Sequence, residues 1–157
     1  MKNQSPLPER LRRAFTPTHR GVIGVVDDLL ALCREEGLEL TWHANHCRVR
    51  PLGMESKEST DVPLPKSVFR AILARLAALC NERTPNSVSP YRGEGECSVG
   101  TNPPVVFRVA FVNTPGEQRL EVRRKAEDKE QAAEFPVLPQ ASGTSQSLSA
   151  NEKTIDP

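Results

Sequence analysis

Apolar residues recur at helical spacing in two segments of the chain, and both patterns predict amphipathic helices. The first helix runs from about Val22 to Glu36, and Gly37 is well placed to stop it. The second runs from about Lys66 to Asn81, and Thr84-Pro85 prevents much continuation. The apolar stripes consist of Val22, Val25, Val26, Leu29, Leu30 and Cys33 in the first helix, and of Phe69, Ile72, Leu73, Leu76, Leu79 and Cys80 in the second.

Between the helices, apolar and polar residues alternate with the period of a β-strand. Leu38 to Trp42 and Cys47 to Arg50 both alternate, and the short turn His43-Ala-Asn-His46 separates them, which is a hairpin pattern. The polar segment Gly53 to Asp61 is typical of a loop.

After the second helix, the chain reads as a loop from Glu82 to Glu94 and then as further strands. Glu96 to Val99 predicts a short strand. Val105 to Val112 predicts a central one, because it is apolar on both sides except at Arg108. Thr114-Pro-Gly116 predicts a turn whose central residues suit type II, and Leu120 to Arg123 returns as an alternating strand.

This order of elements predicts an α+β domain over residues 21–124, with a small antiparallel sheet and two helices packed on it. A PAS-like topology is one way to realise it. Residues 1–20, rich in Pro and Arg, are expected to be a flexible basic arm, and residues 125–157 an acidic, low-complexity, disordered tail. Disordered termini would thus flank the domain.

Charge is distributed unevenly along the chain. The formal net charge is +1, but residues 1–125 hold 19 Lys+Arg against 14 Asp+Glu, whereas residues 126–157 hold 2 against 6. A mildly basic body suits an anionic ligand or an acidic partner, and nucleic acid is less favoured because no concentrated basic stripe exists. With no membrane-length apolar run and no signal-peptide core, we expect a cytoplasmic protein whose four cysteines are free thiols.

Few sequence motifs indicate catalysis, phosphate binding or metal binding. No P-loop sequence is present, and the glutamates in Arg92-Gly-Glu-Gly-Glu96 favour a turn over a phosphate cradle. The His43-x-x-His46-Cys47 sequence has three possible zinc ligands, but no second ligand pair follows, so exposed turn histidines are favoured and no metal is expected.

Four arginines are the candidate site residues. Arg48 and Arg50 share one face of a strand, Arg83 follows the second helix, and Arg108 interrupts an apolar strand. A guanidinium suits phosphate recognition, but an arginine among apolar residues also needs a carboxylate partner or an exit to solvent. For Arg108, ion pairing with Glu117 or Glu121 is the favoured interpretation from residue types alone.

The arginines lie in segments that resemble one known family. Arg48-Val-Arg-Pro-Leu-Gly53, Glu82-Arg-Thr-Pro85, Arg108-Val-Ala110 and Thr114-Pro-Gly-Glu117 followed by Leu120-Glu-Val-Arg123 occur in the order and spacing of motifs in the second N-terminal domain of the type II secretion and type IV pilus traffic ATPases. The similarity covers about Val22 to Arg124. It implies a PAS-like domain whose arginines reach nucleotide phosphates held by a RecA-like ATPase domain. By position, Arg83 and Arg108 would inherit that role, followed by Arg48 and Arg50.

The chain also departs from the family. Asn86-Ser-Val88 stands where the family has Gln-Asp-Gly, Glu39 to Trp42 stands where it has Asp-x-His, and the Walker motifs and catalytic domain are missing. Without them the chain is expected to be non-enzymatic and to meet ATP only through a partner.

The leading hypothesis is therefore a stand-alone domain that acts through protein interaction with a traffic ATPase or another secretion or pilus component. The alternative is a small PAS-like regulatory module that binds a ligand or forms a dimer. Nucleic-acid binding ranks third, and a remnant of a longer ATPase gene is a fourth interpretation.

Overall fold

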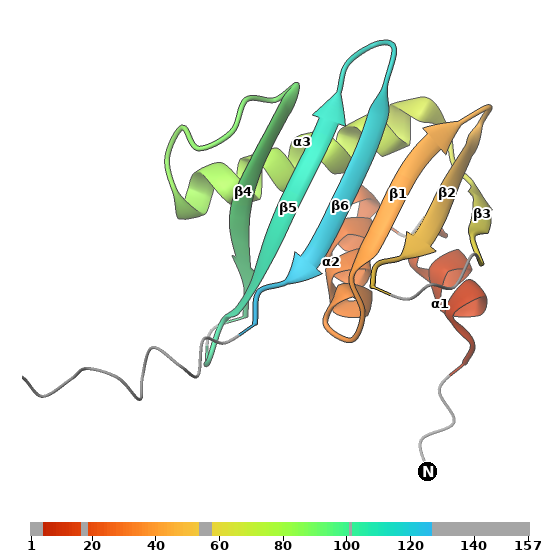
Figure 1. Ribbon diagram of the computed structural model, residues 1–157, viewed down its shortest axis with the longest axis horizontal. Helices are drawn as coiled ribbons and strands as arrows, with labels where there is room; N and C mark the ends of the chain where they lie inside the picture. Colours follow the sequence, from red (N-terminus) through yellow and green to blue (C-terminus); the bar gives the residue numbers. More distant parts are fainter. Residues whose placement is uncertain (1–4, 17–18, 54–57, 101, 127–157) are drawn as a thin grey trace, which may run out of the picture. The chain divides into compact units, whose positions relative to one another are not determined.

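A computed structural model of the chain describes residues 5–16, 19–53, 58–100 and 102–126. These residues form three helices and a six-stranded antiparallel sheet within the compact unit Met1–Lys125 (Figure 1). The predicted α+β class is confirmed. The sheet is larger than the small one expected, and a third helix joins the two predicted ones. The PAS-like topology stays a prediction.

The three helices are α1 (Leu7–Ala14), α2 (Gly21–Cys33) and α3 (Lys66–Arg83). The two predicted helices are confirmed as α2 and α3, although α2 ends before Gly37 and Arg83 is the last residue of α3 rather than just past it. The prediction of a flexible arm was wrong for residues 7–14, because Leu11, Ala14 and Phe15 are buried against the domain. Residues 1–4 and 17–18 lie outside the described part.

The strands are β1 (Leu38–His43), β2 (His46–Pro51), β3 (Thr60–Pro63), β4 (Arg92–Val99), β5 (Val105–Asn113) and β6 (Gln118–Arg124). Their order across the sheet is β3-β2-β1-β6-β5-β4, and every neighbouring pair is antiparallel. The strand β5, predicted to be central, is an interior strand paired on both sides, but it lies next to the edge strand β4. The sheet edges are β3 and β4, at opposite ends of the order.

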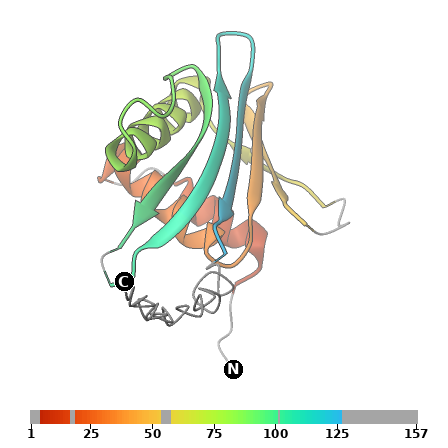
Figure 2. The ribbon, with the colours of Figure 1, turned by 60° about the vertical axis from the view of Figure 1, so that its left-hand side comes forward.

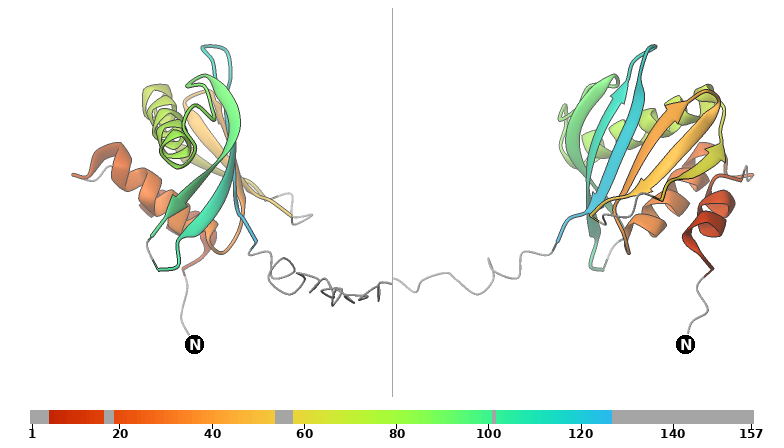
Figure 3. Two further views of the ribbon diagram at one scale, coloured as in Figure 1. Left: turned by 90° about the vertical axis from the view of Figure 1, so that its left-hand side faces the viewer. Right: turned by 45° about the vertical axis from the view of Figure 1, so that its right-hand side comes forward.

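The helices α2 and α3 lie against one face of the sheet, and among the described residues no helix covers the other face (Figures 2 and 3). Side chains alternate along each strand, so residues such as Leu40, Val49 and Phe107 are buried on the covered face while their neighbours face outwards. Phe69, Phe107 and several leucines fill the layer between helices and sheet. The four cysteines are buried free thiols, as expected.

Two strand predictions missed part of the sheet. The segment read as a loop up to Asp61 contains the start of β3, where only Val62 is buried and no alternation is visible. The glycine-containing segment read as a turn belongs to β4. A Cβ at Gly93 or Gly95 would approach Val88 to 2.8 or 2.9 Å, so glycine permits the α3–β4 connection to pack closely on the strand.

Two turns join neighbouring strands. The β1–β2 hairpin is confirmed, with Ala44 and Asn45 between the paired His43 and His46, and both turn residues have positive φ, as a type I′ turn requires. The β5–β6 turn at Thr114 to Glu117 is also confirmed. It is not type II, however, because Gly116 does not have the positive φ that type II demands.

The predicted acidic tail lies outside the described residues, except at its start. The Lys125 N–H donates to the Val106 carbonyl oxygen at 2.8 Å, which extends the β5–β6 pairing by one residue. No described helix is both long enough and apolar enough to cross a membrane.

Candidate functional site

The uncovered face of the sheet presents charged side chains from all six strands. Strand pairing arranges them in rows: Arg48, Thr41, Arg119 and Arg92 share one row, while Arg50, Glu39, Glu121 and Glu94 share the next. A third row contains Arg123, Arg108 and Glu96. The first and third rows carry mostly arginines, and the row between them carries mostly glutamates. Most of the arginines therefore lie close to a carboxylate.

Arg83 and Arg108, the two residues favoured from the sequence, meet at one carboxylate. Glu96 on β4 lies 3.7 Å from the Arg83 Nε, 3.7 Å from the Arg108 Nε and 3.0 Å from the Lys125 Nζ. We call these four residues the Glu96 cluster. It joins the end of α3, two neighbouring strands and the residue after β6, and it combines three positive charges with one negative charge.

The two guanidiniums of the Glu96 cluster keep their donors available. At 3.7 Å they are ion-paired with Glu96, but among the described residues neither has a hydrogen-bond acceptor. The Arg108 side chain is 62 % exposed and that of Arg83 35 %. The pKa of Glu96 is lowered, mainly by the hydrogen bond from Lys125 and also by the nearby guanidiniums, so this carboxylate is ionised at neutral pH. An additional anion could therefore bind both arginines.

Arg108 does not have the partner expected from the sequence. Glu117 lies in the β5–β6 turn, and Glu121 pairs with Arg123 on its own strand. The partner is Glu96, which stands directly opposite Arg108 in the β4–β5 pairing. Arg108 thus has an ion-pair partner and also reaches solvent, but the carboxylate is not one of the two expected, because its identity depends on a strand register that the residue types alone do not reveal.

Beside the Glu96 cluster, the uncovered face has a hollow of about 270 Å³ over Ala110. Arg108 and Arg123 line one side of it, and Glu94 and Glu121 contribute carboxylates. The hollow exists because β5 carries the small Ala110 between longer side chains on the neighbouring strands.

Arg48 and Arg50 are not part of the Glu96 cluster. Their strand, β2, is three strands away from β5, a separation of roughly 14 Å. Arg48 donates from Nε to the Asp61 Oδ1 at 3.0 Å, and Arg50 donates twice to Glu39. Both guanidiniums are thus hydrogen-bonded within the domain, which makes them poorer candidates for phosphate contact than Arg83 and Arg108.

Glu39 is buried although it lies on the uncovered face. It is 7 % exposed and accepts from Arg50 on β2 and from Arg119 on β6, the latter with an N–O distance of 2.6 Å. The pKa of Glu39 is held below its usual value, chiefly by the hydrogen bond from Arg50. This arrangement stabilises the centre of the sheet and engages both carboxylate oxygens of Glu39.

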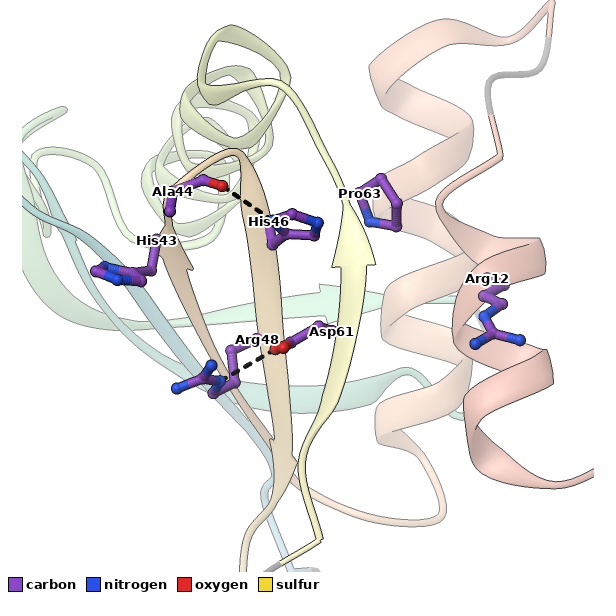
Figure 4. Close-up of a pocket in the computed structure, with 7 residues that line it drawn as sticks. All are labelled: Arg12, His43, Ala44, His46, Arg48, Asp61 and Pro63. Carbon is purple, nitrogen blue, oxygen red and sulfur yellow. Dashed lines mark hydrogen bonds and ion pairs between the residues drawn. The ribbon is translucent and has the colours of Figure 1, made fainter.

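A second hollow, of about 430 Å³, lies at the β1–β2 turn between the strands and α1 (Figure 4). It contains His43, His46, Arg48 and Asp61, with Arg12 from α1. The His46 Nδ1 donates to the Ala44 carbonyl oxygen at 2.9 Å.

The metal hypothesis for this turn fails in its geometry. Cys47 is buried on the covered face, whereas the two histidines lie on the uncovered one, so the three side chains do not converge. Across residues 5–16, 19–53, 58–100 and 102–126, no three His, Cys, Asp or Glu side chains are placed to hold a metal ion.

A scan against protein-family models and a search of curated protein sequences found no match to this chain.

Proposed function

We propose that this domain is a non-catalytic interaction module, related to the N-terminal domains of traffic ATPases, in which Arg83 and Arg108 contact nucleotide phosphate held by a partner ATPase. The observation that carries the proposal is the convergence of these two arginines with Lys125 on Glu96. The order of motifs along the chain supports the relationship to traffic ATPases.

The Glu96 cluster offers a physical route to such a contact. Glu96 holds the two guanidiniums near each other in the free protein, and it does so without using their N–H donors in hydrogen bonds. A phosphate group brings more negative charge than one carboxylate and can accept bidentate hydrogen bonds from each guanidinium. A partner that presents phosphate at this edge of the domain would therefore gain two charge-assisted contacts.

The test is a titration of the full chain with tripolyphosphate, followed by NMR at the arginine Nε–Hε signals. Arg83→Ala and Arg108→Ala are expected to abolish the shifts, and Glu96→Gln to tighten binding several-fold, because a competing negative charge is removed. Arg48→Ala is the matched control and should bind as the wild type does. Equal loss in Arg48→Ala, or binding that survives in Arg83→Ala and Arg108→Ala, would contradict the assignment.

The partner is tested by photo-crosslinking in the native host. A photoreactive residue at Ala110, next to Arg108 on the uncovered face, is expected to capture a traffic ATPase or another secretion or pilus component. The same residue at Ala31, which is exposed on α2, is the control. Capture of a traffic ATPase from Ala31 and not from Ala110 would place the interface elsewhere.

The alternative of a PAS-like ligand-binding module has less support in the described part of the chain. Buried side chains fill the layer beneath the sheet, and the two hollows over the uncovered face are lined by charged residues. Dimer formation, the other part of that alternative, would appear as slowed exchange of β4 amides with rising protein concentration.

A further inference from the structure

The strand β4 is an edge of the sheet, and its pairing with β5 shows which of its backbone groups face away. In an antiparallel ladder, residues directly opposite each other alternate between pairs that exchange hydrogen bonds and pairs that do not. The Asn113 N–H donates to the Tyr91 carbonyl oxygen at 2.6 Å, so Tyr91 and Asn113 form a hydrogen-bonded pair. Two and four residues further along β4, Gly93 and Gly95 therefore bond to β5 as well.

The backbone groups of the alternate residues of β4 face away from β5. Arg92, Glu94, Glu96 and Ser98 direct their N–H and C=O groups towards the free edge. The contacts of Arg92 agree with this assignment. Its N–H donates to the Ser89 Oγ at 3.2 Å, and the Ser89 hydroxyl donates to its carbonyl oxygen at 2.9 Å. A side chain in the preceding loop thus covers the first outward position.

The next three outward positions are open. Within the described residues, no group donates to or accepts from the outward backbone of Glu94, Glu96 and Ser98. Each of the three residues offers one N–H and one C=O along the edge, the spacing that an added strand needs. The strand is also eight residues long, and no proline interrupts it.

Side chains beside the edge indicate the chemistry of an added strand. The exposed Glu94 has no ion-pair partner among the described residues, so a cation facing it would be favourable. On the covered face, Gly93 and Gly95 carry no side chains and Val88 packs over them. An apolar residue of the added strand would meet Val88 there.

Two other occupants fit less well. The chain's own residues 126–157 are acidic, with 6 Asp+Glu against 2 Lys+Arg, and Pro136 and Pro139 interrupt their apolar segment. Antiparallel pairing of two copies centred on Glu94, Gly95 or Glu96 sets Glu94 against Glu94, Glu94 against Glu96, or Glu96 against Glu96, and like charges directly opposite destabilise a sheet.

We propose that β4 accepts an extended segment of a protein partner as a seventh strand, and that this segment carries a Lys or Arg facing Glu94. Main-chain hydrogen bonds to Glu94, Glu96 and Ser98 hold the segment, and its basic residue sets the specificity. The strand addition uses the backbone edge, so it does not need the proposed phosphate contact. Arg83 reaches from α3 on the covered face to Glu96 on the uncovered face, so an added strand would displace its side chain from this ion pair.

The probes are three capped hexapeptides of alternating Thr and Val, added to the isotope-labelled full chain and followed by amide NMR. The first has a central Lys, the second has Glu in its place, and the third is the Lys peptide with alternate amides N-methylated. The Lys peptide is expected to shift the Glu94, Glu96 and Ser98 amides and slow their exchange. The Glu peptide should bind at least about tenfold more weakly, and the N-methylated peptide should not bind. In Glu94→Lys, an exposed substitution, the preference should reverse in favour of the Glu peptide.

The proposal is overturned if no peptide changes these three amides, if β3 responds as strongly as β4, or if Glu94→Lys leaves the charge preference unchanged. Slowing of the three amides with rising protein concentration, in the absence of peptide, would also overturn it, because a second copy would then be the occupant.

Discussion

The two edges of the sheet differ in length, cover and charge. At one edge, β3 has four residues, ends at Pro63 and packs against α1. At the other, β4 has eight residues, and in three of them the outward backbone groups have no partner within residues 5–16, 19–53, 58–100 and 102–126. Natural sheets protect an edge with short strands, prolines or covering helices, and β3 has all three. In the described part of the chain, one edge is therefore closed and the other is available, with the cations of the Glu96 cluster beside it.

The largest effect on stability is expected at the closed edge, where α1 packs against β3. Leu11 is fully buried, so Leu11→Ala should lower the free energy of unfolding by about 2–4 kcal/mol, through lost burial and the cavity left behind. Urea denaturation measures the change, and Arg13→Ala, on the exposed side of α1, should match the wild type. If Leu11→Ala had no effect, residues 7–14 would be the loose arm that the sequence predicted.

At the open edge, the packing of Val88 on β4 requires glycine at positions 93 and 95, because a Cβ there would collide with Val88. Gly95→Ala places a Cβ 2.9 Å from the Val88 Cγ1 and close to Cys80, so we expect a loss of about 1–3 kcal/mol in the free energy of unfolding. Gly116→Ala is the matched control, because its Cβ meets nothing within 4 Å. Equal midpoints for the two variants in urea would show that Val88 does not pack on β4 as described.

Between the two edges, Glu39 joins both halves of the uncovered face through Arg50 and Arg119. Glu39→Gln should destabilise the domain by about 1–2 kcal/mol at pH 7, because two charge-assisted hydrogen bonds are weakened. The folded-state pKa of Glu39 lies below the ordinary 4.5, so its contribution is complete above that value and is lost as the pH falls through the folded-state pKa. Denaturation curves should therefore converge in acid, and a difference that grew on acidification would contradict this.

The smallest effect is expected from Arg48 at the closed edge. Its ion pair with Asp61 is solvent-exposed, and such pairs contribute little to stability. Arg48→Ala should leave the thermal midpoint unchanged within error. Near the open edge, by contrast, Arg108→Ala is expected to abolish the binding of tripolyphosphate. A marked drop in the midpoint of Arg48→Ala would mean that β3 depends on this pair.

Local patterns were enough to predict the helices α2 and α3, the β1–β2 hairpin and the interior strand β5. Each has a long apolar stripe or a clear alternation, and these follow directly from helical and strand geometry. The sequence did not predict α1 or β3, because each buries only a few residues and their partners lie elsewhere in the chain. Gly93 and Gly95 favoured a turn locally, but packing of Val88 overrides that preference.

For the candidate site, residue types indicated Arg83 and Arg108 but not what joins them. Glu96 stands opposite Arg108 only because of the β4–β5 register, and Lys125 falls in a segment read as tail. Register between two consecutive strands is set by the alternation of buried positions and by the connecting turn, and the glycines at 93 and 95 hide that alternation in β4. The separation of Arg48 and Arg50 from the Glu96 cluster could not be predicted either, because their distance from β5 follows from the strand order.

Amide hydrogen exchange of the free protein tests the open edge most directly. We expect the Glu94, Glu96 and Ser98 amides to exchange at rates near those of an unstructured chain, while the amides of Gly93, Gly95 and Cys97 are protected by their bonds to β5. This two-residue alternation along β4 would confirm that the edge is free for an added strand. Equal protection of all six amides would show that the edge is already covered, and would contradict the account.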